Sequence, residues 1–289
     1  MSDSATILDR GYRRYEGERS GVFGAIRSVT WHSIRSVLGL GRSARHKIFP
    51  VISILIAYLP ALVFVGIAAL LPVDLVAEGA LPSYADYVGF IGLAIVLFCG
   101  LVAPEVLVRD RRDGMLGLYL STPLRRDTYL VAKGAAVMAT LTMVTLGPPL
   151  LLLIAYTIEG SGPGGLGDWL VLFVRIVVSG IAISAVFAAV SLAAASLTDR
   201  RAFASVGVIL LLIGSSAVVS ALVEGATMSS NLRMFDLLSM PFELVQRVYG
   251  NPGDYPELST TLVAGSSAGW VISATALVWW RYRRLAITR

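Results

Sequence analysis

Residues 169–198 read WLVLFVRIVVSGIAISAVFAAVSLAAASLT, thirty residues with one charged side chain, Arg175. A helix of about 20 apolar residues can cross a bilayer, because it satisfies its own backbone hydrogen bonds where no water is available. Five other segments contain a comparable uncharged stretch. The six predicted crossings are Ile48–Leu71, Tyr84–Val108, Tyr129–Ile158, Trp169–Thr198, Ala202–Val223 and Leu262–Trp280.

The composition supports this interpretation. The chain has 289 residues, of which 56% are hydrophobic and 15% charged, whereas soluble domains carry roughly 25% charged residues. Its single cysteine, Cys99, lies inside an apolar stretch and cannot form an internal disulfide. The sequence therefore predicts an all-α polytopic membrane protein.

The distribution of Lys and Arg predicts the orientation. Nine of the 24 precede Ile48, six lie between the second and third crossings, two between the fourth and fifth, and four at the C-terminus. The loops on the other side contain only Arg233 and Arg247, with many carboxylates. Because cationic loops resist translocation, both termini are expected to be cytoplasmic. Anionic lipids then account for the net charge of +5, and no nucleic-acid partner is expected.

Two segments outside the crossings have helical apolar periodicity. Within residues 21–40, apolar side chains including Ile26 and Ile34 recur along one stripe, which predicts an interfacial amphipathic helix. The outer segment shows similar spacing and contains Phe235 and Phe242. The predicted organisation is a cytoplasmic segment at 1–47 and a transmembrane domain at 48–289, with a cytoplasmic loop at 105–128 and a re-entrant outer segment at 224–261.

The loop after the second crossing reads EVLVRDRRDGMLGLYLSTPLRRDTYLVAK from Glu105 to Lys133. Along this loop a cluster of charged residues is followed by a glycine, an apolar run and Pro123, a residue that breaks a helix. An apolar run exposed on a cytoplasmic loop needs a partner to cover it, and flanking charges would orient that partner. Glu105 is expected to pair with Arg109 one turn on.

This loop resembles the first cytoplasmic loop in the membrane subunits of type-2 ABC exporters. The resemblance extends to the amphipathic helix, the six crossings and the long outer segment before the last crossing, whose helices would close an outer gate. The matching residues are Glu105, Asp110-Arg111, Gly114-Met115-Leu116, Leu118 to Leu120, Pro123, Arg125-Arg126 and Tyr129-Leu130-Val131-Ala132-Lys133.

The resemblance implies a bacterial plasma-membrane permease that carries a coupling helix for a separate ATPase. Two ATPase subunits would hold ATP and Mg, and the permease would pair with a second copy or a similar permease. No phosphate loop occurs in this sequence, since the glycine-rich run Gly160–Gly167 lacks a lysine. No cofactor or metal is expected in this chain. The expected docking residues are Glu105, Arg109, Asp110, Arg111, Asp113, Gly114, Leu116 and Leu118.

Other residues are candidates for the substrate path or for helix packing. Arg175 is the one cation within an apolar span, and Asp86 is its plausible ion-pair partner. Phe235 and Phe242 belong to the predicted gate. Small residues at four-residue spacing allow close helix approach, either within one bundle or at a dimer seam. In the last crossing they are Gly265, Gly269 and Ser273.

A channel, a scaffold and a membrane-embedded enzyme are the alternatives. An enzyme would need paired catalytic groups at membrane depth, and both histidines, His32 and His46, precede the first crossing. The chain is therefore not expected to be an enzyme by itself. Mostly aliphatic crossings favour an amphipathic small molecule, lipid or peptide as the substrate over a sugar polymer, which would stack on aromatics.

Overall fold

The computed structural model describes residue 17 and residues 20–70 and 81–285. The start of the predicted N-terminal segment, most of the first outer loop and residues 286–289 lie outside this range. The described residues form helices, and six units are long and apolar enough to cross a membrane, which confirms the predicted all-α fold. These are α2 (Ile48–Leu70), Gly92–Arg112 (α5, η2 and α6), Arg126–Ile158 (α8 and α9), α10 (Leu166–Ser196), Arg201–Gly225 (α11 and η3) and α13 (Thr260–Arg284).

The second crossing is interrupted where one continuous helix was predicted. Pro104 has no N–H to donate to the carbonyl of Gly100, so the α-helical ladder cannot continue there. The backbone instead widens, and the N–H of Ala103 donates to the carbonyl of Phe98 at 2.9 Å. The resulting elements are α4 (Tyr84–Phe90), α5 (Gly92–Leu97), the π-helical η2 (Phe98–Val102) and α6 (Glu105–Arg112).

The third crossing is divided in a similar way. One residue, Leu146, separates α8 (Arg126–Thr145) from α9 (Gly147–Ile158). The second and third residues of α9 are Pro148 and Pro149. Two prolines at a helix start are tolerated, because their missing N–H groups would have no partner in that turn.

α10 is the central helix of the bundle and packs against α6, α8, α9, α11, α12 and α13. Its small residues face this core. A Cβ on Gly180 would lie 3.0 Å from the Cβ of Leu146, and the hydroxyls of Ser184 and Thr145 are 2.8 Å apart. The small-residue stripe of this crossing therefore serves packing within one chain.

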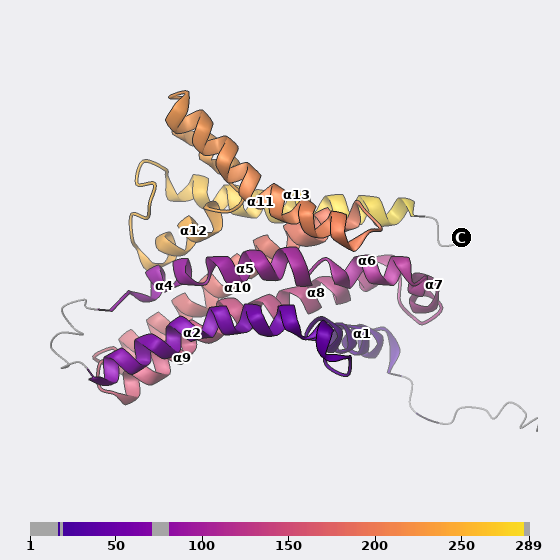
Figure 1. Ribbon diagram of the computed structural model, residues 1–289, viewed down its shortest axis with the longest axis horizontal. Coiled ribbons are helices and arrows are strands. Elements are labelled where there is room, and N and C mark those ends of the chain that lie inside the picture. Colours follow the sequence, from indigo (N-terminus) through magenta and orange to yellow (C-terminus); the bar gives the residue numbers. More distant parts are fainter. Residues whose placement is uncertain (1–16, 18–19, 71–80, 286–289) are drawn as a thin grey trace, which may run out of the picture.

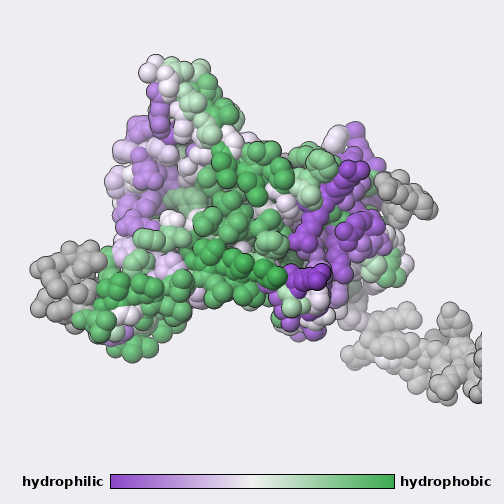
Figure 2. Space-filling view, viewed as in Figure 1, coloured by the Kyte–Doolittle hydropathy of each residue, from purple (hydrophilic) through white to green (hydrophobic). Residues whose placement is uncertain are grey.

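One end of the bundle is basic. The helices α1 (Gly21–Val37), α6 and α7 (Met115–Leu120) lie there with the end of α13 (Figure 1), and we call this the basic end. α4, α12 (Met240–Tyr249) and the α9–α10 turn occupy the opposite end. A broad apolar band separates hydrophilic surfaces at the two ends (Figure 2), as expected for a membrane-spanning chain.

α11 leans away from the other helices (Figure 1). Its unit, Arg201–Gly225, has the smallest buried share of the six candidate crossings. Its first half packs closely on η2, where Ile209 covers Gly100 so tightly that a Cβ there would lie 2.6 Å from Ile209 Cγ1.

Candidate functional site

The loop predicted to dock a partner forms a compact helical turn at the basic end. α6 ends at Arg112, and Gly114 follows with a positive φ of 67°, a conformation that glycine adopts without strain. α7 then runs for six residues before the turn that contains Pro123. The backbone N–H of Arg125 donates to Thr128 Oγ1 at 2.8 Å and so caps the start of α8.

Two of the charged residues predicted for docking, Asp110 and Arg111, lie inside the protein. Lys133 Nζ is 2.6 Å from Asp110 Oδ2, and both side chains are almost fully buried. The hydroxyl of Tyr129 donates to the same carboxylate oxygen at 2.8 Å, while Lys133 also donates to Ser33 Oγ at 2.9 Å. This network joins α6, α8 and α1. The second buried residue is Arg111, whose guanidinium lies at the end of α10.

Two arginines of the loop cap the ends of long helices. Arg111 donates to carbonyl oxygens at the end of α10, among them that of Ser196 at 2.6 Å. Arg126 donates to the carbonyl oxygens of Tyr282 at 3.1 Å and Arg283 at 2.5 Å, at the end of α13. A cation is favourable at a helix C-terminus, where carbonyl groups lack intrahelical partners. The loop is therefore tied to two membrane-spanning helices.

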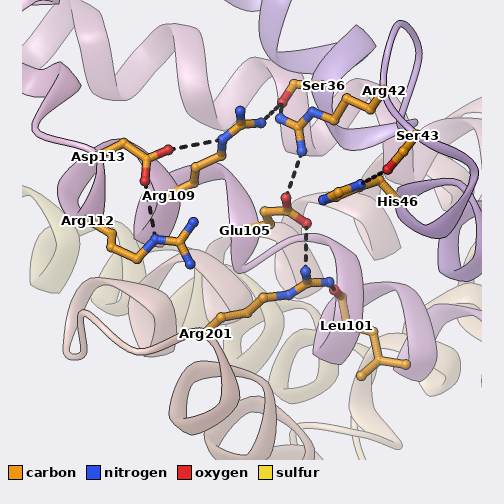
Figure 3. Close-up of polar contacts among 10 residues, drawn as sticks. All are labelled: Ser36, Arg42, Ser43, His46, Leu101, Glu105, Arg109, Arg112, Asp113 and Arg201. Atoms are coloured by element: carbon orange, nitrogen blue, oxygen red, sulfur yellow. Dashed lines mark hydrogen bonds and ion pairs between the residues drawn. The ribbon is translucent and has the colours of Figure 1, made fainter.

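Glu105 connects three parts of the basic end (Figure 3). Its Oε1 lies 2.8 Å from Nη1 of Arg42, in the α1–α2 connection, and its Oε2 lies 3.4 Å from Nη1 of Arg201, at the start of α11. The predicted Glu105–Arg109 pair is wrong. Arg109 instead pairs with Asp113 at 3.3 Å, because Glu105 already faces two cations from distant parts of the chain.

Asp113 is an exposed carboxylate between α6 and α7. Arg112 and Arg109 both hydrogen-bond it, and these contacts lower the pKa of its carboxyl group, with the bond from Arg112 the larger cause. The carboxyl group of Asp113 therefore stays ionised to a lower pH than that of an ordinary aspartate.

α7 has one buried and one exposed apolar side. Leu116 is 8% exposed and belongs to the core, whereas Leu118 is 61% exposed. The side chains that a partner could reach on this loop are therefore Leu118, the half-exposed Met115, and the charged group of Arg109, Arg112 and Asp113. Leu116 fastens the helix to the bundle.

Asp86 and Arg175 of the predicted gate lie near α12 and do not pair with each other. No ion pair joins Arg175 to Asp86 among the described residues. Asp86 accepts from Ser83 at 2.7 Å and from Gln246 of α12 at 3.3 Å. Burial raises the pKa of Tyr249, also on α12, to about 12, opposed by Ser179 and by the charge of Arg175. Asp86 thus contacts α12 through Gln246, and the charge of Arg175 lies near Tyr249 of that helix.

Phe242 and Phe235 occupy different surroundings. The Phe242 ring lies 5.9 Å from that of Phe187 in α10 and also approaches Gly92 of α5. Phe235 contacts the ring of Trp270 in α13 and is 47% exposed. Phe242 therefore joins the outer segment to two crossings, and Phe235 joins it to the last one.

The small-residue face of α13 is open. A Cβ added to Gly265 or Gly269 would have no described atom of a neighbouring helix within 4 Å, and both glycines lie on an exposed face with Ser273. This face of α13 is therefore not used for packing inside the described part of the chain.

Comparison with known families decides the class of protein. A family model described as "ABC-2 family transporter protein" matches residues 40–285. This chain belongs to the ABC-2 transporter family. Members are multi-pass, non-catalytic permease components that generally pair with an ABC ATPase. A search of curated proteins found no significant match. Among the described residues of this ABC-2 permease, no group of three or more His, Cys, Asp or Glu could hold a metal ion.

The outer segment of the ABC-2 permease contains buried ionic contacts that the sequence analysis missed. Glu243 pairs with Arg247 at 2.8 Å and accepts the backbone N–H of Asp254 at 2.9 Å. Arg233 lies over the ring of Tyr255 at 3.8 Å. The four-residue spacing of Glu243 and Arg247 was a usable signal, but the Arg233–Tyr255 contact depends on how the segment folds back.

Proposed function

We propose that this ABC-2 permease is the membrane part of an ATP-driven exporter and that its ATPase docks on α7. One observation carries the proposal: α7 exposes the apolar side chain of Leu118 on the same loop of the basic end as the charged group of Arg109, Arg112 and Asp113. An apolar contact surrounded by charges suits a specific protein interface, because the charges set the orientation of docking. ATP and Mg would bind to the ATPase.

The contacts behind α7 support transmission of movement into the bundle. Asp110 and Lys133 tie α6 to α8, Ser33 extends the tie to α1, and Arg111 holds the end of α10. A push on α7 therefore acts on several helices together. ATP-driven approach of two ATPases would shift the permease between inward-open and outward-open states.

The basic end would face the cytoplasm of a bacterial cell, with both termini on that side of the plasma membrane. The distribution of Lys and Arg supports this orientation. The working unit would contain two ATPases and two permeases, either two copies of this chain or this chain with a similar permease. The open small-residue face of α13 is a candidate for helix contact between them.

An amphipathic small molecule, lipid or peptide is the proposed substrate. A cavity of about 540 Å³ between α10, α11 and α13 supports an apolar component. Its wall includes Phe203, Leu211, Trp270 and Leu277, and its lining is almost wholly apolar. Such a cavity would accept a hydrocarbon portion, because the hydroxyls of Thr198 and Ser273 are few beside its apolar side chains.

Co-purification tests the proposed function. The full chain would be expressed with each ABC ATPase encoded by its host, and the complex captured through a tag on the permease. We expect one ATPase to be retained and its ATP hydrolysis to depend on the permease. A permease that retains none of them, in detergent and in lipid nanodiscs, would contradict the proposal and leave the channel and scaffold alternatives.

Arg175→Ala tests the role of the intramembrane cation. We expect loss of most of the transport with normal assembly, because Arg175 lies near Tyr249 of α12, in the part of α10 that is far from the basic end. Transport into vesicles and co-purification of the ATPase would be measured together. Arg175→Lys, which keeps the charge, should restore much of the transport. Normal transport by Arg175→Ala would remove this residue from the proposed gate.

A further inference from the structure

Four arginines surround a cavity at the basic end (Figure 3). The cavity has a volume of about 420 Å³ and lies between the α1–α2 connection, α6 and the start of α11. We call it the arginine pocket and define it by Arg42, Arg109, Arg112, Arg201, Glu105 and Asp113.

The arginine pocket has more positive than negative charge. Glu105 is shared by Arg42 and Arg201, and Asp113 is shared by Arg109 and Arg112, so four guanidinium groups meet two carboxylates. Like charges held this close repel one another unless an anion joins them. The pocket therefore has an excess of two positive charges. A phosphate group bound there would neutralise part of this excess.

Hydrogen-bond donors in the pocket remain available. A guanidinium has five N–H donors. Arg112 contacts Asp113 through Nε at 3.2 Å, and its Nη groups form no hydrogen bond with any other described residue. Its side chain is 65% exposed, and that of Arg201 is 40% exposed. Planar guanidinium groups match phosphate oxygens in pairs, which makes arginine well suited to this ligand.

A cavity with one apolar side adjoins the arginine pocket. It has a volume of about 240 Å³ and shares His46, Glu105 and Arg201 with the pocket. Val37, Phe49 and Pro50 form its apolar side together with Leu101 and Val102 of η2, and Arg45 adds a further cation to its wall. The charged end of the protein borders the apolar band (Figure 2). The cationic pocket is thus followed directly by an apolar wall.

We propose that the arginine pocket binds the phosphate headgroup of an anionic phospholipid, with an acyl chain against the apolar side of the adjoining cavity. The order of the two cavities carries this choice. A soluble anion would use the pocket alone, whereas a phospholipid fills both parts. Basic pockets between membrane helices bind anionic headgroups through the same chemistry. The site does not depend on an ATPase partner.

Native mass spectrometry of the delipidated full-length chain in detergent tests the site. The chain would be titrated with phosphatidylglycerol and, separately, with phosphatidylcholine. We expect phosphatidylglycerol to bind at least about tenfold more tightly, since only it keeps an uncompensated negative charge. Millimolar glycerol phosphate or inorganic phosphate should not displace it. Equal binding of the two lipids would overturn the proposal, and displacement by a soluble phosphate would show an anion site without a lipid.

Variants of the pocket arginines, with a control of equal charge, test whether phosphatidylglycerol binds at the arginine pocket. Arg42→Gln/Arg201→Gln and Arg109→Gln/Arg112→Gln should each weaken phosphatidylglycerol binding about tenfold or more. The second variant keeps both ion pairs of Glu105, so it remains informative if the first variant misfolds. The control Arg35→Gln/Arg200→Gln removes the same net charge from exposed arginines that do not line the pocket. An equal loss in the control would overturn the assignment.

Discussion

Lys133→Met is expected to lower the free energy of unfolding by about 3–5 kcal/mol, the usual effect of breaking a buried ion pair. The substitution keeps most of the length of the side chain but leaves the carboxylate of Asp110 buried beside Tyr129 without its cation. An unpaired charge in a region of low dielectric constant is far less stable than a paired one. Chemical denaturation of the purified permease in detergent measures the loss.

The double variant Asp110→Asn/Lys133→Met separates charge from packing. The asparagine oxygen can still accept the hydrogen bond from Tyr129, so most of the lost stability should return. Arg112→Met is the control, because it removes an exposed cation from α6, the helix that carries Asp110. It should lower the free energy of unfolding by no more than about 0.5 kcal/mol. A double variant no more stable than Lys133→Met would show that the ion pair is not the cause.

Leu118→Asp should remove the ATPase from the complex. An apolar side chain at the centre of an interface can contribute about 2–4 kcal/mol, which is roughly 30- to several hundred-fold in affinity. The new carboxylate would also be desolvated on docking. Because Leu118 is 61% exposed in the permease alone, the chain itself should fold normally. Retention of the ATPase on the tagged permease, with size-exclusion chromatography of the permease, measures both effects.

Two further variants make this test specific. Leu166→Asp makes the same chemical change at an exposed leucine at the start of α10, at the opposite end of the bundle, and should leave the complex intact. Leu116→Asp is a poor test, because it places a carboxylate in the core and should destabilise the fold. If Leu118→Asp retains the ATPase as well as Leu166→Asp does, the docking surface lies elsewhere.

Much of the fold could be predicted from the sequence. Six crossings follow from apolar runs that exclude charge over the width of a bilayer. The interruptions were also signalled, by Pro104 in the second crossing and by Pro148 and Pro149 in the third. Their consequences were harder to predict, because a proline can kink, widen or end a helix, and packing against neighbours selects among these outcomes.

The candidate site was predicted as a stretch of sequence rather than as a surface. The docking loop was found, but its eight residues have different roles in the structure. Asp110, Arg111 and Leu116 face inward, whereas Leu118 and Asp113 face outward. Adjacent residues of a short helix differ in direction by about 100°, so burial depends on where α1, α8 and α10 lie.

The membrane class, the number of crossings and the asymmetry of charge between the two ends follow from the amino-acid sequence, because bilayer thickness and charge desolvation act on local stretches of chain. The pairing of the charges follows from the packing of the helices. Glu105 meets Arg42 and Arg201 instead of its neighbour Arg109, and Asp110 meets Lys133 across two helices. Electrostatic attraction acts between atoms that are close in space, and folding brings together residues far apart along the chain.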